Sequence, residues 1–118
     1  MSVTHAPILT AIAFQLSAAL ENYQMQVDDL VNPWLQTAQY DLVGRAFDEV
    51  RMLKGAMPEL SGDMVELMIC HVELMKALWL SNTKPPERDA AAVEEVRKRH
   101  RQAADTMRER CIRVFSRR

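Results

Sequence analysis

Three histidines are the side chains of this 118-residue chain best suited to acid–base or metal chemistry near neutral pH. His71 and His100 fall on apolar rows of two predicted helices, so in a folded bundle they could face each other or share one cavity. His5 lies near the start of the chain, where we expect it to face solvent. Because four-helix bundles can hold metal ions and haem at their centres, a cofactor site around the inner two histidines is one interpretation.

The spacings that bind cofactors are nevertheless missing around these histidines. The chain has no Cys-x-x-Cys-His run for attached haem, no Glu-x-x-His pair for two iron atoms and no His-Glu-x-x-His. The residues three positions before His71 and His100 are Met68 and Arg97. A histidine on an apolar row is more often a hydrogen-bonded core residue, so we predict no metal and no cofactor. A metal- or haem-binding bundle stays as the less favoured alternative.

Other reactive side chains do not assemble into a reaction centre either. The chain has no glycine-rich phosphate loop and no Gly-x-Ser-x-Gly. Neighbouring acids such as Asp48 and Glu49 point about 100° apart on a helix, so they form solvated faces and not a catalytic pair. We therefore predict that the protein is not an enzyme and has no catalytic residues.

The two cysteines, Cys70 and Cys111, both fall at apolar-facing positions of predicted helices. Two cysteines in a chain long enough to build a core do not make a disulfide framework, so we expect reduced thiols packed as small apolar groups. A single disulfide between two helices is the alternative.

The elements that must position these side chains are helices. Apolar residues make up 48% of the chain and only three glycines interrupt it. Asn32-Pro33 is typical of a helix start, Gly55 and Pro58 mark a helix end, and no helix can cross Pro85-Pro86. These signals predict an all-α protein with helices over about 5–31, 33–56, 62–81 and 86–116. Short connections favour antiparallel neighbours, so we expect an up-down-up-down four-helix bundle that forms one domain over residues 1–118.

Residues 64–80 form the most apolar stretch of the chain, with two apolar rows at helical spacing. The first row is Met64, Leu67, His71, Leu74 and Leu78, and the second is Val65, Met68, Val72, Met75 and Trp79. A helix this apolar needs other helices, or a second copy of the protein, to cover most of its sides. The residues that we expect to bind a partner are Met64, Leu67, Met68, Met75 and Trp79. In the helix over 33–56 the expected buried row is Leu35, Ala38, Leu42, Ala46, Val50 and Leu53.

Positive charge is concentrated at the end of the chain. Residues 97–118 hold nine basic and two acidic residues, whereas residues 1–96 hold six basic and fourteen acidic ones. The candidate basic surface consists of Arg97, Arg99, Arg101, Arg108, Arg110, Arg113 and Arg117. Such a segment could bind the phosphates of a nucleic acid, but it could equally pair with acids of its own bundle or with an acidic partner. Phe115 is the single aromatic residue among these arginines, so the segment offers little aromatic surface for bases to stack on.

These patterns favour a non-enzymatic interaction protein, an adaptor, chaperone or regulator, that forms a homodimer or binds a protein partner. Nucleic-acid binding through residues 97–118 is the alternative. The layout of a small helical bundle with a basic amphipathic last helix resembles the small cytoplasmic helical chaperones and adaptors of bacterial secretion and flagellar systems. No apolar run reaches the roughly 18 residues that span a membrane, and no Lys or Arg precedes the apolar run 8–20, so we predict a cytoplasmic protein with no membrane contact.

Overall fold

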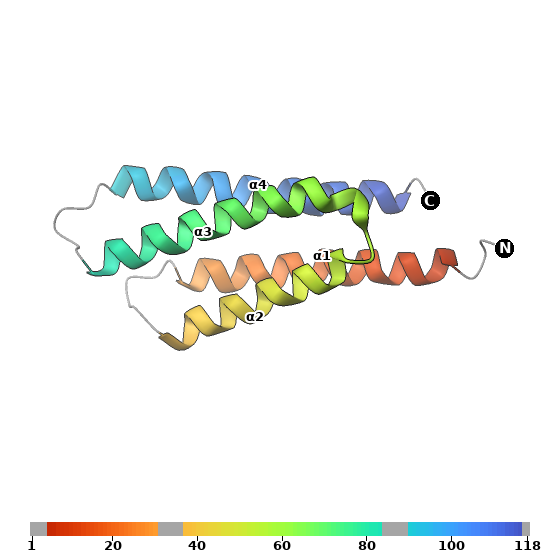
Figure 1. Cartoon of the computed structure of the whole chain (residues 1–118), viewed down its shortest axis with the longest axis horizontal. Helices are drawn as coiled ribbons and strands as arrows, with labels where there is room; N and C mark the ends of the chain where they lie inside the picture. The colour runs from red at the N-terminus through yellow and green to blue at the C-terminus, as the bar shows by residue number, and fades with distance from the viewer. Residues whose placement is uncertain (1–4, 31–36, 84–89, 117–118) are drawn as a thin grey trace.

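The computed structural model describes residues 5–30, 37–83 and 90–116 of the chain. Helices account for nearly all of these residues (Figure 1). They are α1 (His5–Leu30), α2 (Thr37–Lys54), α3 (Ser61–Thr83) and α4 (Ala90–Ser116), and a short 3-10 helix, η2 (Pro58–Leu60), precedes α3. The prediction of an all-α four-helix bundle is therefore confirmed. The predicted helix starts at Asn32-Pro33 and near Pro86 lie outside the described residues.

The turn between α2 and α3 follows from its residue types. α2 ends at Lys54, and the N–H groups of Gly55 and Ala56 donate to the carbonyls of Met52 and Leu53 at 3.2 Å. Pro58 has no N–H to donate, so it cannot continue α2, and it begins η2 instead. α3 then begins at Ser61, one residue before the predicted start, and ends at Thr83, two residues after the predicted end.

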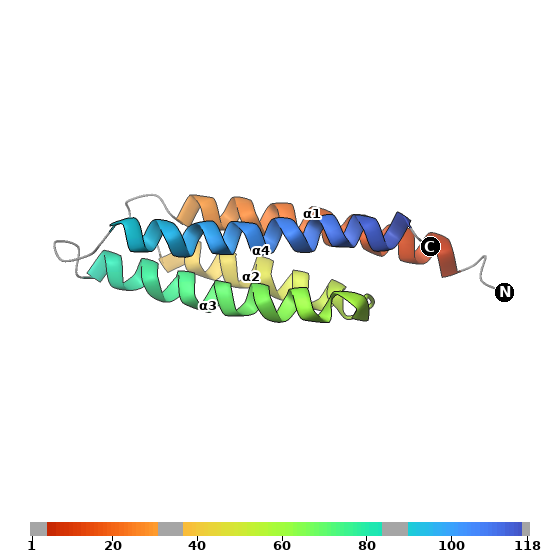
Figure 2. The ribbon, with the colours of Figure 1, turned by 90° about the horizontal axis from the view of Figure 1, so that it is seen from above.

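Side-chain pairs show that α1 and α2 run in opposite directions. The amide of Gln39 on α2 donates to the Gln26 carbonyl of α1 at 2.8 Å, and Phe47 of the same helix contacts Tyr23. Figure 1 shows the chain reversing its direction from one helix to the next. α1 packs closely against α2 and α4, and α3 against α4, whereas α2 and α3 approach each other less closely. Figure 2 shows α2 and α3 on one side of the molecule, with α1 and α4 on the other.

The core fills the space between the four helices. The first predicted row of α3 faces this core, with Leu67 and Leu74 fully buried. In α2 the predicted row is wrong at two positions, because Ala38 and Leu42 are exposed and Val43 is buried with Ala46, Phe47 and Val50. The first half of the predicted row is therefore shifted by one residue from the side of α2 that packs on α1. The mixed composition of α2 does not show from the sequence alone which side is buried.

Candidate functional site

A buried cluster of Tyr23, His71 and His100 joins three of the helices. The Tyr23 Oη atom of α1 lies 2.6 Å from His71 Nδ1 of α3 and 2.6 Å from His100 Nε2 of α4. Tyr23 and His100 are fully buried, and His71 is half-buried. The two histidines therefore meet at one point in the bundle, as their rows predict. The helical period alone places Tyr23 on the apolar side of the first predicted helix. A buried tyrosine hydroxyl needs a hydrogen-bond partner, and this need is the signal that could have linked Tyr23 to the two histidines.

The single hydroxyl hydrogen decides the direction of these two bonds. Tyr23 can donate to one imidazole and must accept from the other. The Nδ1 atom of His100 is buried without a partner among the described residues. An unpartnered acceptor costs less than an unpartnered N–H, so His100 carries its proton on Nε2 and donates to Tyr23. Tyr23 then donates to His71 Nδ1.

Burial keeps all three groups of the cluster uncharged. It lowers the pKa of His100 from 6.5 to about 4, with a smaller contribution from His71 in the same direction. Burial also lowers the pKa of His71, although the nearby Asp48 partly opposes this. The pKa of Tyr23 is raised, mainly by burial. A second proton on His71 would occupy Nδ1 and leave the Tyr23 hydroxyl with no acceptor, whereas one on His100 would put a charge on the buried Nδ1, which has no partner among the described residues. The cluster is therefore most stable as a neutral unit.

The geometry of this cluster suits a structural tie between helices. His100 is inaccessible to a solute, and its Nε2 is already engaged by Tyr23. Within residues 5–30, 37–83 and 90–116, no group of three or more His, Cys, Asp or Glu side chains could hold a metal ion. The cluster therefore holds α1, α3 and α4 together through directional bonds in an otherwise apolar core.

Both cysteines are buried free thiols, so the alternative of a disulfide between helices is wrong. The Cys70 thiol donates to a Glu66 carboxylate oxygen at 3.6 Å, and the Cys111 thiol donates to the Ala13 carbonyl at 3.4 Å. Burial raises the pKa of both thiols, which keeps them protonated and poorly nucleophilic.

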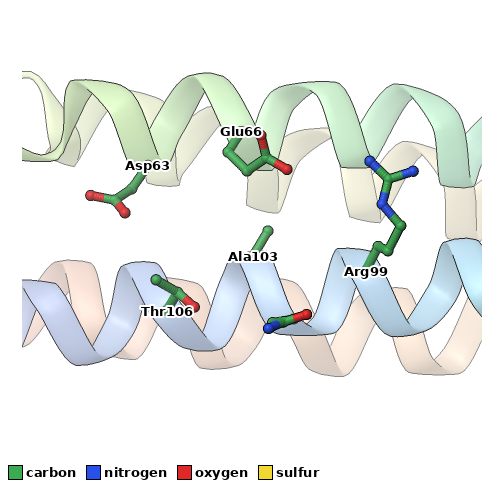
Figure 3. Close-up of a pocket in the computed structure, with 6 residues that line it drawn as sticks. Asp63, Glu66, Arg99, Ala103 and Thr106 are labelled. Carbon is green, nitrogen blue, oxygen red and sulfur yellow. The ribbon is translucent and has the colours of Figure 1, made fainter.

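A groove of about 310 Å³ runs between α3 and α4 (Figure 3). Figure 3 shows Asp63 and Glu66 on α3 across from Arg99, Ala103 and Thr106 on α4. Its charged groups are already engaged: Asp63 accepts from Arg110, Glu66 from Cys70, and Arg99 donates to Glu73. A ligand would have to displace these partners, so the groove is a poor candidate for a binding site.

The predicted basic surface is largely neutralised within the bundle. Arg101 and Arg108 pair with Asp28 and Glu21 of α1 at 2.9 and 3.0 Å. Arg99 and Arg110 pair with Glu73 and Asp63 of α3. α4 is thus flanked by acids on both neighbouring helices, which accounts for the opposite charges of the two parts of the chain.

The remaining arginines of the predicted surface do not extend it. Arg97 pairs with Glu94 one turn earlier on α4, and Arg113 with Glu109. Arg117 lies outside the described residues. Most of these arginines therefore stabilise helix packing or their own helix, and the structure does not gather them on one open face.

An apolar stripe on α3 is the most prominent exposed feature of the described residues. It consists of Val65, Met68, Ile69, Val72 and Trp79, which are between 39% and 59% exposed. These five are half of the large apolar side chains that are exposed in the described chain, and the others are divided among α1, α2 and α4. The second predicted row of α3 is therefore left largely uncovered by the subunit itself.

The predicted partner-binding residues divide between the core and this stripe. Met64 and Leu67 are buried in the core of the subunit, so they cannot contact a partner directly. Met75 is half-buried and packs against the core. Met68 and Trp79 belong to the apolar stripe, and Val65, Ile69 and Val72 join them there. The period of the helix identified both rows, but only their burial in the bundle distinguishes the two.

A scan of protein-family models, a search of curated proteins and a search of solved structures each returned no match to this chain. Among the described helices, none has an apolar segment long enough to cross a bilayer.

Proposed function

We propose that this protein is a non-enzymatic interaction protein, an adaptor, chaperone or regulator, that binds other protein surfaces through the apolar stripe of α3. The observation that carries the proposal is the concentration of half the exposed large apolar side chains on one side of one helix. Exposed apolar side chains scattered singly are ordinary, whereas a contiguous stripe is typical of a protein–protein contact. Free thiols are typical of proteins in a reducing compartment, so we propose that the protein acts in the cytoplasm.

The engagement of the α4 arginines supports a protein partner over a nucleic acid. Arg99, Arg101, Arg108 and Arg110 each pair with an acid of another helix. Binding phosphates would mean exchanging these pairs for new ones, with little net gain in charge neutralisation. The apolar stripe can be covered without breaking any of these ion pairs.

Site-specific photo-crosslinking in the native host tests this function. A photoreactive phenylalanine analogue would replace Ile69 or Val72 in the stripe, and Met25 in a matched control. Met25 is 61% exposed but lies on α1, away from the stripe. We expect defined protein adducts, to this chain or to another, from the two stripe positions only. Adducts that are absent, or equally abundant at Met25, would contradict the proposal.

A further inference from the structure

We infer that the surface that covers the apolar stripe is a second copy of this chain, bound by a two-fold axis that passes at the level of Val72 and sets α3 antiparallel to its counterpart. This inference rests on the proposed function and names the partner. Three features of the described residues carry it: the spacing of the stripe, the charges on α2, and the level at which their midpoints lie.

The spacing of the stripe calls for a helix as its partner. Val65, Val72 and Trp79 of the stripe are seven residues apart, and Met68 follows Val65 by three residues, as the half-buried Met75 beside the stripe follows Val72. This is the a and d spacing of a coiled-coil seam, in which side chains of one helix fit between those of another. A second helix lying along α3 would therefore contact the stripe from Val65 to Trp79, with the exposed Lys76 between Val72 and Trp79.

The order of side chains along the stripe fits an antiparallel copy of itself. An axis at Val72 sets that small side chain against its own counterpart. It sets Val65, the small residue at one end, opposite the large Trp79 at the other end of the partner. A large side chain facing a small one is the arrangement that fills a helix–helix interface without a void.

The outer side of α2 carries charges that are complementary to themselves under the same operation. Asp41, Arg45, Asp48 and Arg51 alternate in sign, and the side chain of each is more than half exposed. In an antiparallel pair of α2 helices, Arg45 faces the partner's Asp48, and Asp41 faces the partner's Arg51. All of these contacts join opposite charges, as an isologous interface requires.

Two aromatic contacts show that the stripe of α3 and the charges of α2 are centred at the same level along the bundle, so one two-fold axis can relate both. Phe47 stacks on His71, and Tyr40 meets Trp79 edge to face, so residues 47 and 40 of α2 lie level with 71 and 79 of α3. By this register Val72 lies level with residue 46 of α2. Residue 46 is also the midpoint of Asp41 and Arg51, and it is within one residue of the midpoint of Arg45 and Asp48. The stripe and the charges are therefore centred on the same level, on two helices that lie on the same side of the molecule (Figure 2).

The exposed area of the stripe is too small to form a stable interface without a contribution from α2. The five stripe side chains present on the order of 400 Å² of surface, about half of the ~800 Å² that each partner of a stable interface buries. The charged side of α2 supplies the rest. An interface with α3 as its apolar centre and α2 as its polar rim has the usual anatomy of a specific contact.

Light scattering of the purified chain alone tests the inference. We expect a species of twice the 13.5 kDa chain mass at micromolar concentration. Ile69→Glu and Val72→Glu should each weaken the dimer at least about 100-fold, because each buries a charge in an apolar seam. Met25→Glu, a change of the same kind at an exposed position of α1, should leave the dimer intact. Circular dichroism would confirm that each variant keeps its helix content.

Cysteine crosslinking tests the antiparallel register. Val72→Cys lies at the axis and should form a disulfide-linked dimer under mild oxidation. Val65→Cys alone should not, since about 14 residues of helix, or roughly 20 Å, would separate the two thiols. The native thiols are buried, so wild-type protein is the blank. Crosslinking by Val65→Cys and not by Val72→Cys would overturn the register.

A charge-reversed variant tests the role of α2. Asp41→Arg, Arg45→Asp, Asp48→Arg and Arg51→Asp together keep the pairs within the helix and the complementarity between two identical chains. A mixed dimer with wild type would place like charges opposite each other. After joint unfolding and refolding, mixed dimers should fall about tenfold below the statistical share. A statistical share would overturn the α2 contact.

The dimer and the proposed function can be disproved separately. A purified chain that stays monomeric at high micromolar concentration overturns the second copy as the partner. The function proposal fails only if the stripe also gives no specific adducts in the native host.

Discussion

The ring of Phe47 lies flat on the imidazole of His71, with the ring centroids 4.2 Å apart and the planes 7° apart. The hydrogen bond from Tyr23 reaches His71 within the plane of the imidazole, at Nδ1, while Phe47 covers its face. His71 is thus held from two directions by two other helices. Since α2 and α3 approach each other less closely than the other neighbours do, this stack is one of the contacts that close that side of the bundle.

Removal of the Tyr23 hydroxyl should destabilise the fold more than its size suggests. Tyr23→Phe keeps the ring but leaves His71 Nδ1 and His100 Nε2 without their partner. Two buried polar atoms without hydrogen bonds should cost about 2–4 kcal/mol of unfolding free energy, measured by urea denaturation. Adding His100→Leu should recover part of this loss, because an apolar pair needs no partner. A loss below about 0.5 kcal/mol in Tyr23→Phe would show that these bonds contribute little.

Stability should fall as the solution becomes acidic. The pKa of His100 is 6.5 when unfolded and about 4 when folded, so the unfolded chain binds more protons between these values. The contribution of His100 to the free energy of unfolding is complete above pH 6.5, declines as the pH falls, and reaches its minimum below about pH 4. The loss should be roughly 3 kcal/mol, and urea midpoints measured from pH 7.5 to 4.5 would follow it.

The matched variant for this pH series is His100→Gln. Its amide can still donate to Tyr23 but does not titrate. We expect a shallower dependence of stability on pH in this variant than in wild type. An identical dependence would assign the acid sensitivity to other groups.

The ion pairs made by the arginines of α4 should differ in strength according to their burial. The Asp63 side chain that accepts from Arg110 is only 11% exposed, whereas Arg113 and Glu109 are 62% and 69% exposed. Arg110→Gln should cost about 1–2 kcal/mol because it leaves a carboxylate that is largely buried without its cation. Arg113→Gln should cost less than about 0.5 kcal/mol. Equal effects on thermal unfolding would contradict this ranking.

Gly44 offers a way to stabilise the protein. It lies inside α2, and a Cβ atom added there would meet no heavy atom within 4 Å. Gly44→Ala should therefore raise the free energy of unfolding by about 0.5–1 kcal/mol, through the lower backbone entropy of alanine when unfolded. Gly55→Ala is the comparison, because its Cβ would lie 3.1 Å from the Met52 carbonyl oxygen, and we expect no gain there. A destabilised Gly44→Ala protein would reveal a close contact at this position.

Local signals in the chain are sufficient to predict its helices and their breaks. Proline lacks an N–H and glycine favours helix ends, so Gly55 and Pro58 locate the turn before α3 without any knowledge of its neighbours. The inner row of α3 is equally predictable, because residues three and four apart share one side of any helix. The meeting of His71 and His100 follows in part from the same period.

Only the tertiary structure decides which of these rows are covered. In sequence, both rows of α3 are apolar at helical spacing, but Leu67 is fully buried in the bundle while Val72 is 59% exposed. The same holds for four arginines of α4, Arg99, Arg101, Arg108 and Arg110, whose acidic partners lie 26 to 87 positions away in the chain. The helical period is a property of neighbouring residues, whereas burial and ion pairing depend on which helices pack together and at what distance. The sequence of this protein therefore determines its helices and their apolar sides, and the packing of those helices decides which side is left for a partner.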